Sequence, residues 1–209
     1  RNYCKRHYGV NLAGLNSIKK YREIISDYLT KHPDAKFITG SGWNETLMTG
    51  TGLLKEDLDC VSTDIPIVMV SDNFHSLWVN SKTLEMAGIH KDSGEIENGI
   101  VERFPDGEPT GTLREGWTGI IENLLPDYSV DEYKKAFMAY SKYANSLGIV
   151  GVFDPWLYPD SNAVEALKQL AKEKALNLYI KGAYTADPSN GVNQIAEFAE
   201  KRHADSINE

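Results

Sequence analysis

The chain has 209 residues, of which 41% are hydrophobic and 25% are charged, and its formal net charge is −8 at pH 7. These numbers fit a globular protein with one large domain or two small ones. The negative charge argues against a nucleic-acid partner, because phosphate binding needs clustered Lys and Arg. No run approaches the ~20 apolar residues of a membrane span, so we expect no membrane partner either.

The two cysteines, Cys4 and Cys60, form no Cys-x-x-Cys and no Cys/His zinc pattern. Two lone thiols fit a reducing compartment, although a single disulfide between them stays open. We therefore expect a cytoplasmic protein. The first residue is Arg1 and no closing element precedes Glu209, so we also expect a segment of a longer protein.

The first predicted elements are a helix and two strands. Apolar residues recur at helical spacing over 17–29, and Pro33 stops that helix. A short strand is expected over 36–39, before Gly40-Ser41-Gly42, and an apolar run over 65–70 predicts a second strand. This strand leads into residues 72–80, which we expect to form a loop.

The loop over 72–80 contains Asp72, His75, Trp78 and Asn80. These polar and aromatic groups favour binding of a polar small molecule. The alternative is a turn that carries ordinary surface residues and one anchoring Trp.

Turn and cap signals follow. Asn80 or Ser81 begins a short helix that Gly88 ends. Pro105-Asp106-Gly107 predicts a hairpin between strands at 99–103 and 109–113.

After Glu115 the pattern changes to strands that alternate with capped helices, which indicates parallel βαβ units. Ser129 with Glu132 is a capping box that opens a helix ended by Gly148. The remaining expected elements are a buried strand over 149–153, a helix to about Lys174 that Asn162 caps together with Glu165, a strand over 176–183 and a helix over 192–203.

Each candidate site residue also has a structural interpretation. His75 is a candidate for chemistry or substrate contact, and the alternative is a structural histidine bonded to the backbone. Trp43 and Trp78 are ligand contacts or buried anchors. Asp154 follows a predicted parallel strand, where α/β active sites gather, or forms a turn before Pro155. Glu115 is a catalytic carboxylate or a charge at a helix start.

No complete metal or nucleophile motif is present in the sequence: it has no His-x-His, no His-Glu-x-x-His, no Gly-x-Ser-x-Gly and no phosphate-binding glycine loop. We therefore expect neither a catalytic residue nor a metal ligand within this chain.

Six short motifs in order across about 115 residues resemble amidohydrolase family 3 of the metal-dependent hydrolase superfamily. They are Gly40-Ser41-Gly42-Trp43; Leu58-Asp59 with Pro66; Asp72, His75 and Trp78-Val79-Asn80-Ser81-Lys82 with Leu84; Gly88-Ile89 with Asp92; Asp106-Gly107 with Pro109-Thr110-Gly111 and Glu115; and Gly148 to Asp154. The family includes N-substituted formamide deformylases and proteins called exoenzyme regulatory proteins.

The resemblance implies an α/β fold, or α+β for the isolated segment, in which partial TIM-barrel βα units carry a β-rich insertion. The expected domains are a helical lead-in over 1–35, the β-rich insertion with the substrate-side loop over 36–115, and βα units of a partial barrel over 116–209.

The resemblance also implies metal-assisted hydrolysis of an amide or formamide C–N bond. The divalent metal, expected to be zinc, belongs to the full-length protein, because the family's ligand positions match nothing here; Lys181 lacks the context of the family's bridging lysine. In this reading the substrate-binding residues are His75, Trp43, Trp78, Asn80, Glu115 and Asp154.

A second hypothesis is that the chain is a non-catalytic domain that binds small molecules or has a regulatory role. Strands that lack neighbours would expose an edge, so we also expect self-association.

Overall fold

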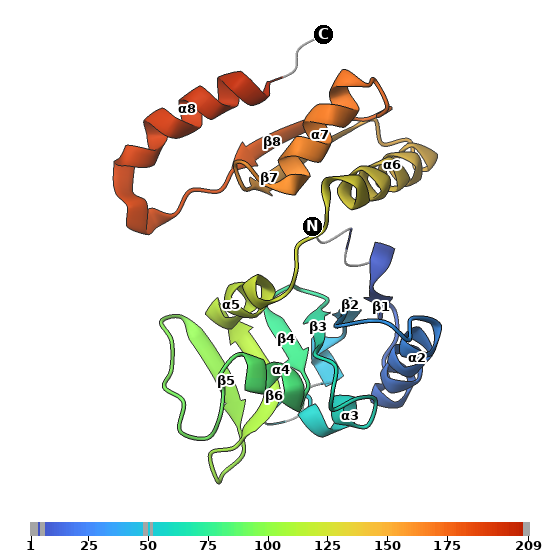
Figure 1. The fold of residues 1–209 in the computed structure, drawn as a ribbon, viewed down its shortest axis with the longest axis vertical. Helices are drawn as coiled ribbons and strands as arrows, with labels where there is room; N and C mark the ends of the chain where they lie inside the picture. The colour runs from blue at the N-terminus through green and yellow to red at the C-terminus, as the bar shows by residue number, and fades with distance from the viewer. Residues whose placement is uncertain (1–3, 5–6, 48–49, 51, 207–209) are drawn as a thin grey trace. The chain divides into compact units, whose positions relative to one another are not determined.

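The computed structural model describes residue 4, residues 7–47, residue 50 and residues 52–206. The chain forms two compact units, Cys4–Pro126 and Asp127–Glu209 (Figure 1). Each unit contains both strands and helices, so the fold is a mixed α/β fold.

The Cys4–Pro126 unit is built on a six-stranded sheet with the strand order β1-β2-β3-β4-β6-β5. Strands β1, β2 and β3 are parallel to one another, and the remaining neighbours are antiparallel. The strands are β1 (Val10–Asn11), β2 (Ile38–Trp43), β3 (Ile67–Ser71), β4 (Ser76–Val79), β5 (Gly99–Arg103) and β6 (Pro109–Glu115). The helices are α2 (Ile18–Lys31), the 3-10 turn η1 (Glu45–Leu47), α3 (Lys55–Asp59), α4 (Ser81–Met86) and α5 (Gly116–Leu124).

Strand β3 lies at the centre of this unit and is buried on both faces. Ile67 and Met69 belong to one hydrophobic cluster, and the alternate residues Val68 and Val70 belong to another. Successive side chains of a strand point to opposite faces, so a strand covered on both sides needs a continuous apolar run. The run over 65–70 is therefore the sequence signature of this central strand.

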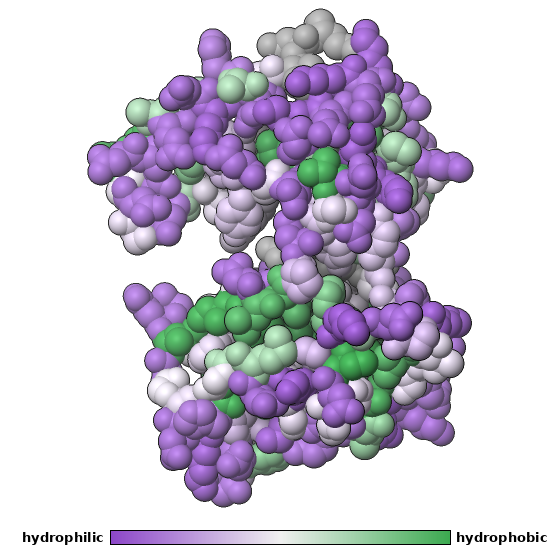
Figure 2. All heavy atoms as spheres, viewed as in Figure 1, coloured by the Kyte–Doolittle hydropathy of each residue, from purple (hydrophilic) through white to green (hydrophobic). Residues whose placement is uncertain are grey.

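Helices cover both faces of the sheet. Tyr21 and Ile25 of α2 pack in the cluster that contains Trp43, whereas Leu84 of α4 and Trp117 of α5 pack in the other cluster. Apolar residues also gather on the surface over α5 (Figure 2), where Ile120 and Leu124 are exposed.

Both predicted turn signals of this unit are present in the structure. The hairpin joins β5 and β6, and Gly107 has the positive φ of +93° that its turn requires. Asn80 is the N-cap of α4, and Gly88 follows its end with a φ of +67°.

In its described residues, the Asp127–Glu209 unit contains a two-stranded parallel sheet and three long helices. Its elements are α6 (Val130–Ser146), β7 (Gly151–Leu157), α7 (Asn162–Lys172), β8 (Tyr179–Tyr184), the 3-10 segment η2 (Pro188–Asn193) and α8 (Gln194–Asp205). Strands β7 and β8 pair in parallel across α7, which is the predicted βαβ connection. The capping box of Ser129 and Glu132 opens α6 as expected.

Two details of this unit differ from the prediction. The side chain that caps α7 is Ser161, which accepts a hydrogen bond from Val164 N, rather than Asn162. Strand β7 begins two residues later than expected and is largely exposed rather than buried. Its only strand neighbour among the described residues is β8, so an apolar run here does not mean a covered strand.

The two units divide the chain differently from the expected ranges 1–35, 36–115 and 116–209. Helix α2 is not a separate lead-in, because it packs in the same core as β2 and β3. Helix α5 lies beyond Glu115 but packs on the same sheet, so the boundary falls at Pro126.

No disulfide joins the buried Cys4 to the exposed Cys60. Among the described residues, no helix is long and apolar enough to cross a membrane.

Candidate functional site

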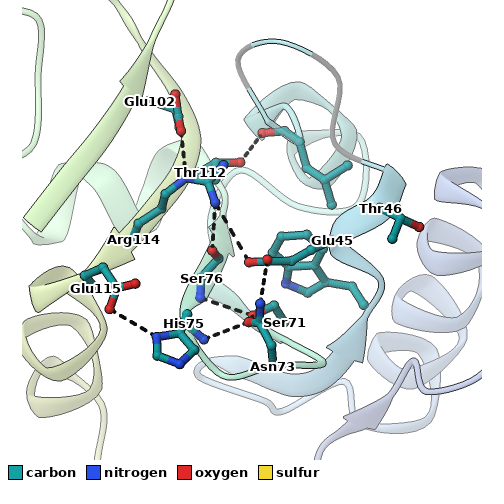
Figure 3. Close-up of polar contacts among 12 residues, drawn as sticks. Glu45, Thr46, Ser71, Asn73, His75, Ser76, Glu102, Thr112, Arg114 and Glu115 are labelled. Carbon is teal, nitrogen blue, oxygen red and sulfur yellow. Dashed lines mark hydrogen bonds and ion pairs between the residues drawn. The ribbon is translucent and has the colours of Figure 1, made fainter.

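The central stretch of the sequence forms the turn and second strand of a hairpin rather than one loop. Residues 72–75 connect β3 to β4, and the expected loop over 72–80 is wrong from Ser76 onward, because Ser76–Val79 pairs with both β3 and β6. The turn places His75 at the end of the sheet, with 65% of its side chain exposed (Figure 3).

Asn73 holds the turn in shape. Its Oδ1 accepts hydrogen bonds from the Ser71 hydroxyl at 2.7 Å and from the His75 backbone N–H at 2.9 Å. The Ser71 Oγ in turn accepts from Ser76 N at 3.1 Å. Asn readily forms such local turns, and here the turn fixes where the His75 side chain begins.

Glu115 ends β6 and directly precedes α5, with the unusual backbone angles φ +53° and ψ −116°. Residues with a Cβ rarely adopt this conformation, which costs about 1–3 kcal/mol. It is held from both sides, because Glu115 N donates to His75 O at 2.9 Å and Gly116 N donates to Asn98 O at 2.8 Å. The sharp strand-to-helix turn aims the Glu115 side chain away from the sheet core.

The side chains of His75 and Glu115, which are 40 residues apart in the sequence, are in contact at this end of the sheet. His75 Nδ1 lies 3.1 Å from Glu115 Oε2, and the two side chains are 65% and 55% exposed. Two of the predicted site residues therefore form one polar pair that a ligand can reach. An imidazole edge beside a carboxylate can bind the polar groups of a small molecule.

A charged network that the sequence did not reveal lies beside this pair (Figure 3). Arg114 donates through Nε to Glu102 Oε1 at 2.7 Å and through Nη1 to Ser76 Oγ at 3.3 Å. Its Nη1 also lies 3.9 Å from Glu45 Oε1, and Glu45 Oε2 accepts from Asn73 Nδ2 at 2.6 Å. The network thus links β5, β6 and η1 to the turn that carries His75.

One signal for this network was present in the sequence. The hairpin prediction pairs 99–103 with 109–113, so a basic residue just beyond one strand and an acidic residue in the other indicate a cross-strand ion pair. No comparable pattern pointed to Glu45 or Asn73, because they lie in the short 3-10 turn η1 and in the turn between β3 and β4.

Trp43 and Trp78 are structural anchors. Both side chains have 0% exposure. Trp43 Nε1 donates to Met69 O at 2.9 Å, and Trp78 Nε1 donates to Leu54 O at 2.8 Å. The expectation that they contact a substrate does not fit this placement, because neither ring offers a surface to a ligand. Their indoles fill the core and satisfy backbone carbonyls instead.

Asn80 is likewise fully buried, and its amide joins three segments. Its Oδ1 accepts from Ile67 N and Thr83 N, and its Nδ2 donates to Ser62 O and Ile65 O. Asn80 therefore ties α4 and the 62–65 segment to β3 and has no polar atom left for a substrate, so this assignment is corrected too.

Asp154 belongs to the other unit, so the structure does not bring it together with His75. It lies inside β7 rather than after its end, opposite Gly182 of β8. Its Oδ1 accepts from Trp156 N at 3.0 Å, which is a local turn around Pro155. This geometry fits the turn-forming alternative.

A cavity of about 630 Å³ lies elsewhere in the Asp127–Glu209 unit, between α8 and the segments that follow β7 and β8. None of the predicted site residues lines it; its wall includes Tyr158, Asp160, Thr185, Phe198 and Lys201. In the described part of the chain, no group of three or more His, Cys, Asp or Glu side chains is placed to hold a metal ion.

Three related proteins share recognisable sequence with the chain. A putative amidohydrolase, YtcJ of Bacillus subtilis (strain 168), is 28% identical over 143 residues, which are 68% of this chain and 27% of that protein. The N-substituted formamide deformylase of Arthrobacter pascens is 25% identical over 145 residues, 67% of this chain and 27% of the enzyme. The exoenzymes regulatory protein AepA of Pectobacterium carotovorum subsp. carotovorum is 25% identical over 190 residues, 88% of this chain and 41% of that protein.

The fold is similar to that of a solved structure. An uncharacterized metal-dependent hydrolase from Pyrococcus horikoshii OT3 superposes with a TM-score of 0.55 at 19% identity, over 90% of this chain and 35% of the hydrolase. The chain thus spans between about a quarter and two-fifths of the length of the proteins that it matches.

The pattern that defines the amidohydrolase family matches residues 5–205, which is nearly the whole chain. The chain belongs to the amidohydrolase family.

Proposed function

We propose that the chain is a segment of a metal-dependent amidohydrolase that hydrolyses a C–N bond of an amide or formamide type. The family match over residues 5–205 supports a hydrolase, and the relationship to an N-substituted formamide deformylase supports the bond type. The parallel β7-α7-β8 unit is the kind of connection that builds a TIM barrel, so we propose that it is part of one in the whole protein.

Within this proposal, His75 and Glu115 contact the substrate. The observation that carries this role is their meeting at 3.1 Å from positions 40 residues apart, both largely exposed. Backbone strain is often kept at functional sites, and Glu115 holds its carboxylate beside His75 in a strained conformation. The neighbouring Glu45–Arg114–Glu102 network keeps the surrounding strands in register.

The described residues do not fit a metal site, so we derive no chemical step through a metal here. We propose that a divalent ion, zinc in particular, is held by residues elsewhere in the whole protein, as metal-dependent hydrolases require. The chain by itself would then lack hydrolase activity.

The proposal also includes a cellular compartment, a small-molecule partner and an oligomeric state. We place the protein in the cytoplasm because its cysteine usage fits a reducing compartment. Its partner is a small amide-type molecule. The chain itself is proposed to self-associate, because β7 and β8 pair only with each other among the described strands.

The decisive experiment compares variants of the full-length protein, loaded with zinc, on N-substituted formamides and N-acylated amines. His75→Ala is expected to lower kcat/KM at least about 10-fold, because the variant loses a polar contact to the substrate. His203→Ala, an exposed position on α8, is the matched control and keeps full activity.

A loss within about twofold for His75→Ala would reject the substrate role of this pair. Binding of the same compounds without any turnover by the metal-loaded protein would favour the second candidate function, a small-molecule-binding or regulatory protein. The similarity to a protein named for exoenzyme regulation favours testing that candidate.

A further inference from the structure

The contact between His75 and Glu115 determines which ring nitrogen of His75 carries the proton. An ionised carboxylate has no proton to donate, so at 3.1 Å from Glu115 Oε2 the His75 Nδ1 is the donor. A neutral imidazole carries one N–H and one bare nitrogen, and the partner of one nitrogen decides the state of the other. The second ring nitrogen of His75, Nε2, is therefore an acceptor whenever the ring is neutral.

Nε2 is also available to bind a ligand. No residue in the described part of the chain forms a hydrogen bond with it, and 65% of the His75 side chain is exposed. A buried His with both nitrogens engaged would be a structural residue, but this ring uses one nitrogen internally and offers the other to solvent.

The placement of Glu115 is fixed by its backbone. Its N–H donates to His75 O at 2.9 Å, so the two residues are joined through the main chain as well as the side chains. Figure 3 shows the Glu115 carboxylate directed toward the imidazole, whereas the adjacent Arg114 is directed toward Glu102 and Ser76. Glu115 has the strained φ of +53° at the junction of β6 and α5, where these contacts form.

We propose that Glu115 is a positioning residue that fixes His75 as the Nδ1–H tautomer, so that Nε2 accepts a hydrogen bond from the N–H of an amide-type substrate. The ligand half of this inference rests on the proposed function, whereas the tautomer half does not. It specifies the substrate class further: amides and formamides with one N-substituent carry the required N–H, and N,N-disubstituted ones do not.

The tautomer half is tested by ¹⁵N NMR of histidine-labelled chain at about pH 9, where imidazoles are neutral. The two-bond ¹H–¹⁵N pattern of His75 is expected to show the proton on Nδ1. Glu115→Ala removes the acceptor, and the pattern should move to the Nε2–H form or to a mixture, while the signals of His203 stay unchanged. Glu115→Gly serves the same purpose if the Ala variant folds poorly, because Gly tolerates a positive φ.

Two results would overturn the tautomer half: Nε2–H as the main form in the unaltered chain, or an unchanged His75 pattern in both Glu115 variants. A purely structural role of Glu115 would alter stability without moving the tautomer.

The ligand half is tested with the full-length, metal-loaded protein on matched pairs of N-monosubstituted and N,N-disubstituted formamides. The unaltered protein should favour the monosubstituted compound in kcat/KM by at least about 10-fold, since the disubstituted compound leaves Nε2 without a donor. Glu115→Ala and His75→Ala should lose that preference.

Turnover with no preference would overturn the ligand half while the proposed function stands. Absence of turnover for both compounds would overturn the proposed function and the ligand half together, and the NMR result would still decide the tautomer half.

Discussion

Glu115 shows how one residue can carry a conformational cost for the sake of a contact. Its angles of φ +53° and ψ −116° are mirror images of an ordinary extended conformation, which only Gly adopts without strain. The cost persists because Glu115 and Gly116 donate to His75 O and Asn98 O on either side.

This leads to a stability prediction. Glu115→Gly should be about 1 kcal/mol more stable than Glu115→Ala, because relief of about 1–3 kcal/mol of strain exceeds the entropy that Gly adds to the unfolded chain. Both variants lose the carboxylate, so the comparison isolates the backbone. Urea unfolding measures the difference. A more stable Ala variant would show that the backbone at Glu115 is not strained.

Asn80 is a residue for which the sequence suggested a site and the structure gives an architectural role. Its amide makes buried hydrogen bonds to Ile67, Thr83, Ser62 and Ile65. Asn80→Ala should therefore cost about 3 kcal/mol or more in unfolding free energy, because several buried backbone groups lose their partners.

The exposed Asn123 of α5 provides the control, since Asn123→Ala should stay within about 0.5 kcal/mol. If Asn80→Ala matched that control in urea unfolding, the anchoring role would be wrong.

These residues also show what the sequence could and could not reveal. It singled out His75 within a stretch of polar and aromatic residues, and Glu115 as a catalytic carboxylate or a charge at a helix start. It could not separate them from Trp43, Trp78 and Asn80. Burial depends on which segments cover a position, and those segments are distant in sequence.

At the scale of elements, local signals were reliable. The capping box at Ser129, the hairpin at Gly107 and the helix end at Gly88 formed as expected, because each depends on a few neighbouring residues. Strand β1 was missed, since it has only two residues and depends on its pairing with β2. Pairing between distant strands leaves no local signature.

The capping box of α6 has a pH-dependent part. Hydrogen bonds from the Ser129 backbone N–H and hydroxyl hold the pKa of Glu132 below its usual value. A carboxyl with a lowered folded-state pKa contributes stability above its ordinary pKa and loses it as pH falls through the lowered value. The cap should therefore be fully formed at neutral pH and weaken in acid.

Ser129→Ala should cost about 1 kcal/mol at pH 7 and less at acidic pH, where Glu132 is protonated in either protein. Ser161→Ala is the matched control, because Ser161 caps α7 through Val164 N without a carboxylate at that position. Its cost should be similar at pH 7 and nearly independent of pH. Equal pH dependence of the two variants in urea unfolding would contradict the role of Glu132.

In the molecule as a whole, the two units differ in how many large apolar side chains they bury. In Cys4–Pro126, strand β3 is covered on both faces, and the large side chains of Trp43, Trp78 and Tyr21 are fully buried. In the described part of Asp127–Glu209, the buried hydrophobic residues include three alanines, and large side chains on the strands remain exposed. These buried residues are Tyr133, Ala136, Ala144, Val164, Ala166, Leu170 and Leu178.

The exposed aromatic side chains on β7 and β8 reduce the stabilisation that this unit gains from hydrophobic burial. Phe153, Trp156 and Tyr179 are 59%, 66% and 71% exposed, so much of their apolar surface contributes nothing to folding. Burial stabilises by roughly 25 cal/mol per Å² of apolar surface, and this unit gains less of it than the other. Segments with few buried apolar contacts open at lower free energy than a well-packed core.

The units should therefore unfold separately. Amide hydrogen exchange, followed by mass spectrometry at increasing urea concentrations, measures this on a dilute solution of the chain. We expect β7, β8 and α8 to lose protection at a urea concentration at least about 1 M lower than β3 and β4. Helix α8 reports on this unit because Asp205 accepts hydrogen bonds from Lys168 and Tyr184. If all of these segments lost protection at one urea concentration, the two units would unfold as a single cooperative structure, and the difference in core packing would not decide their stability.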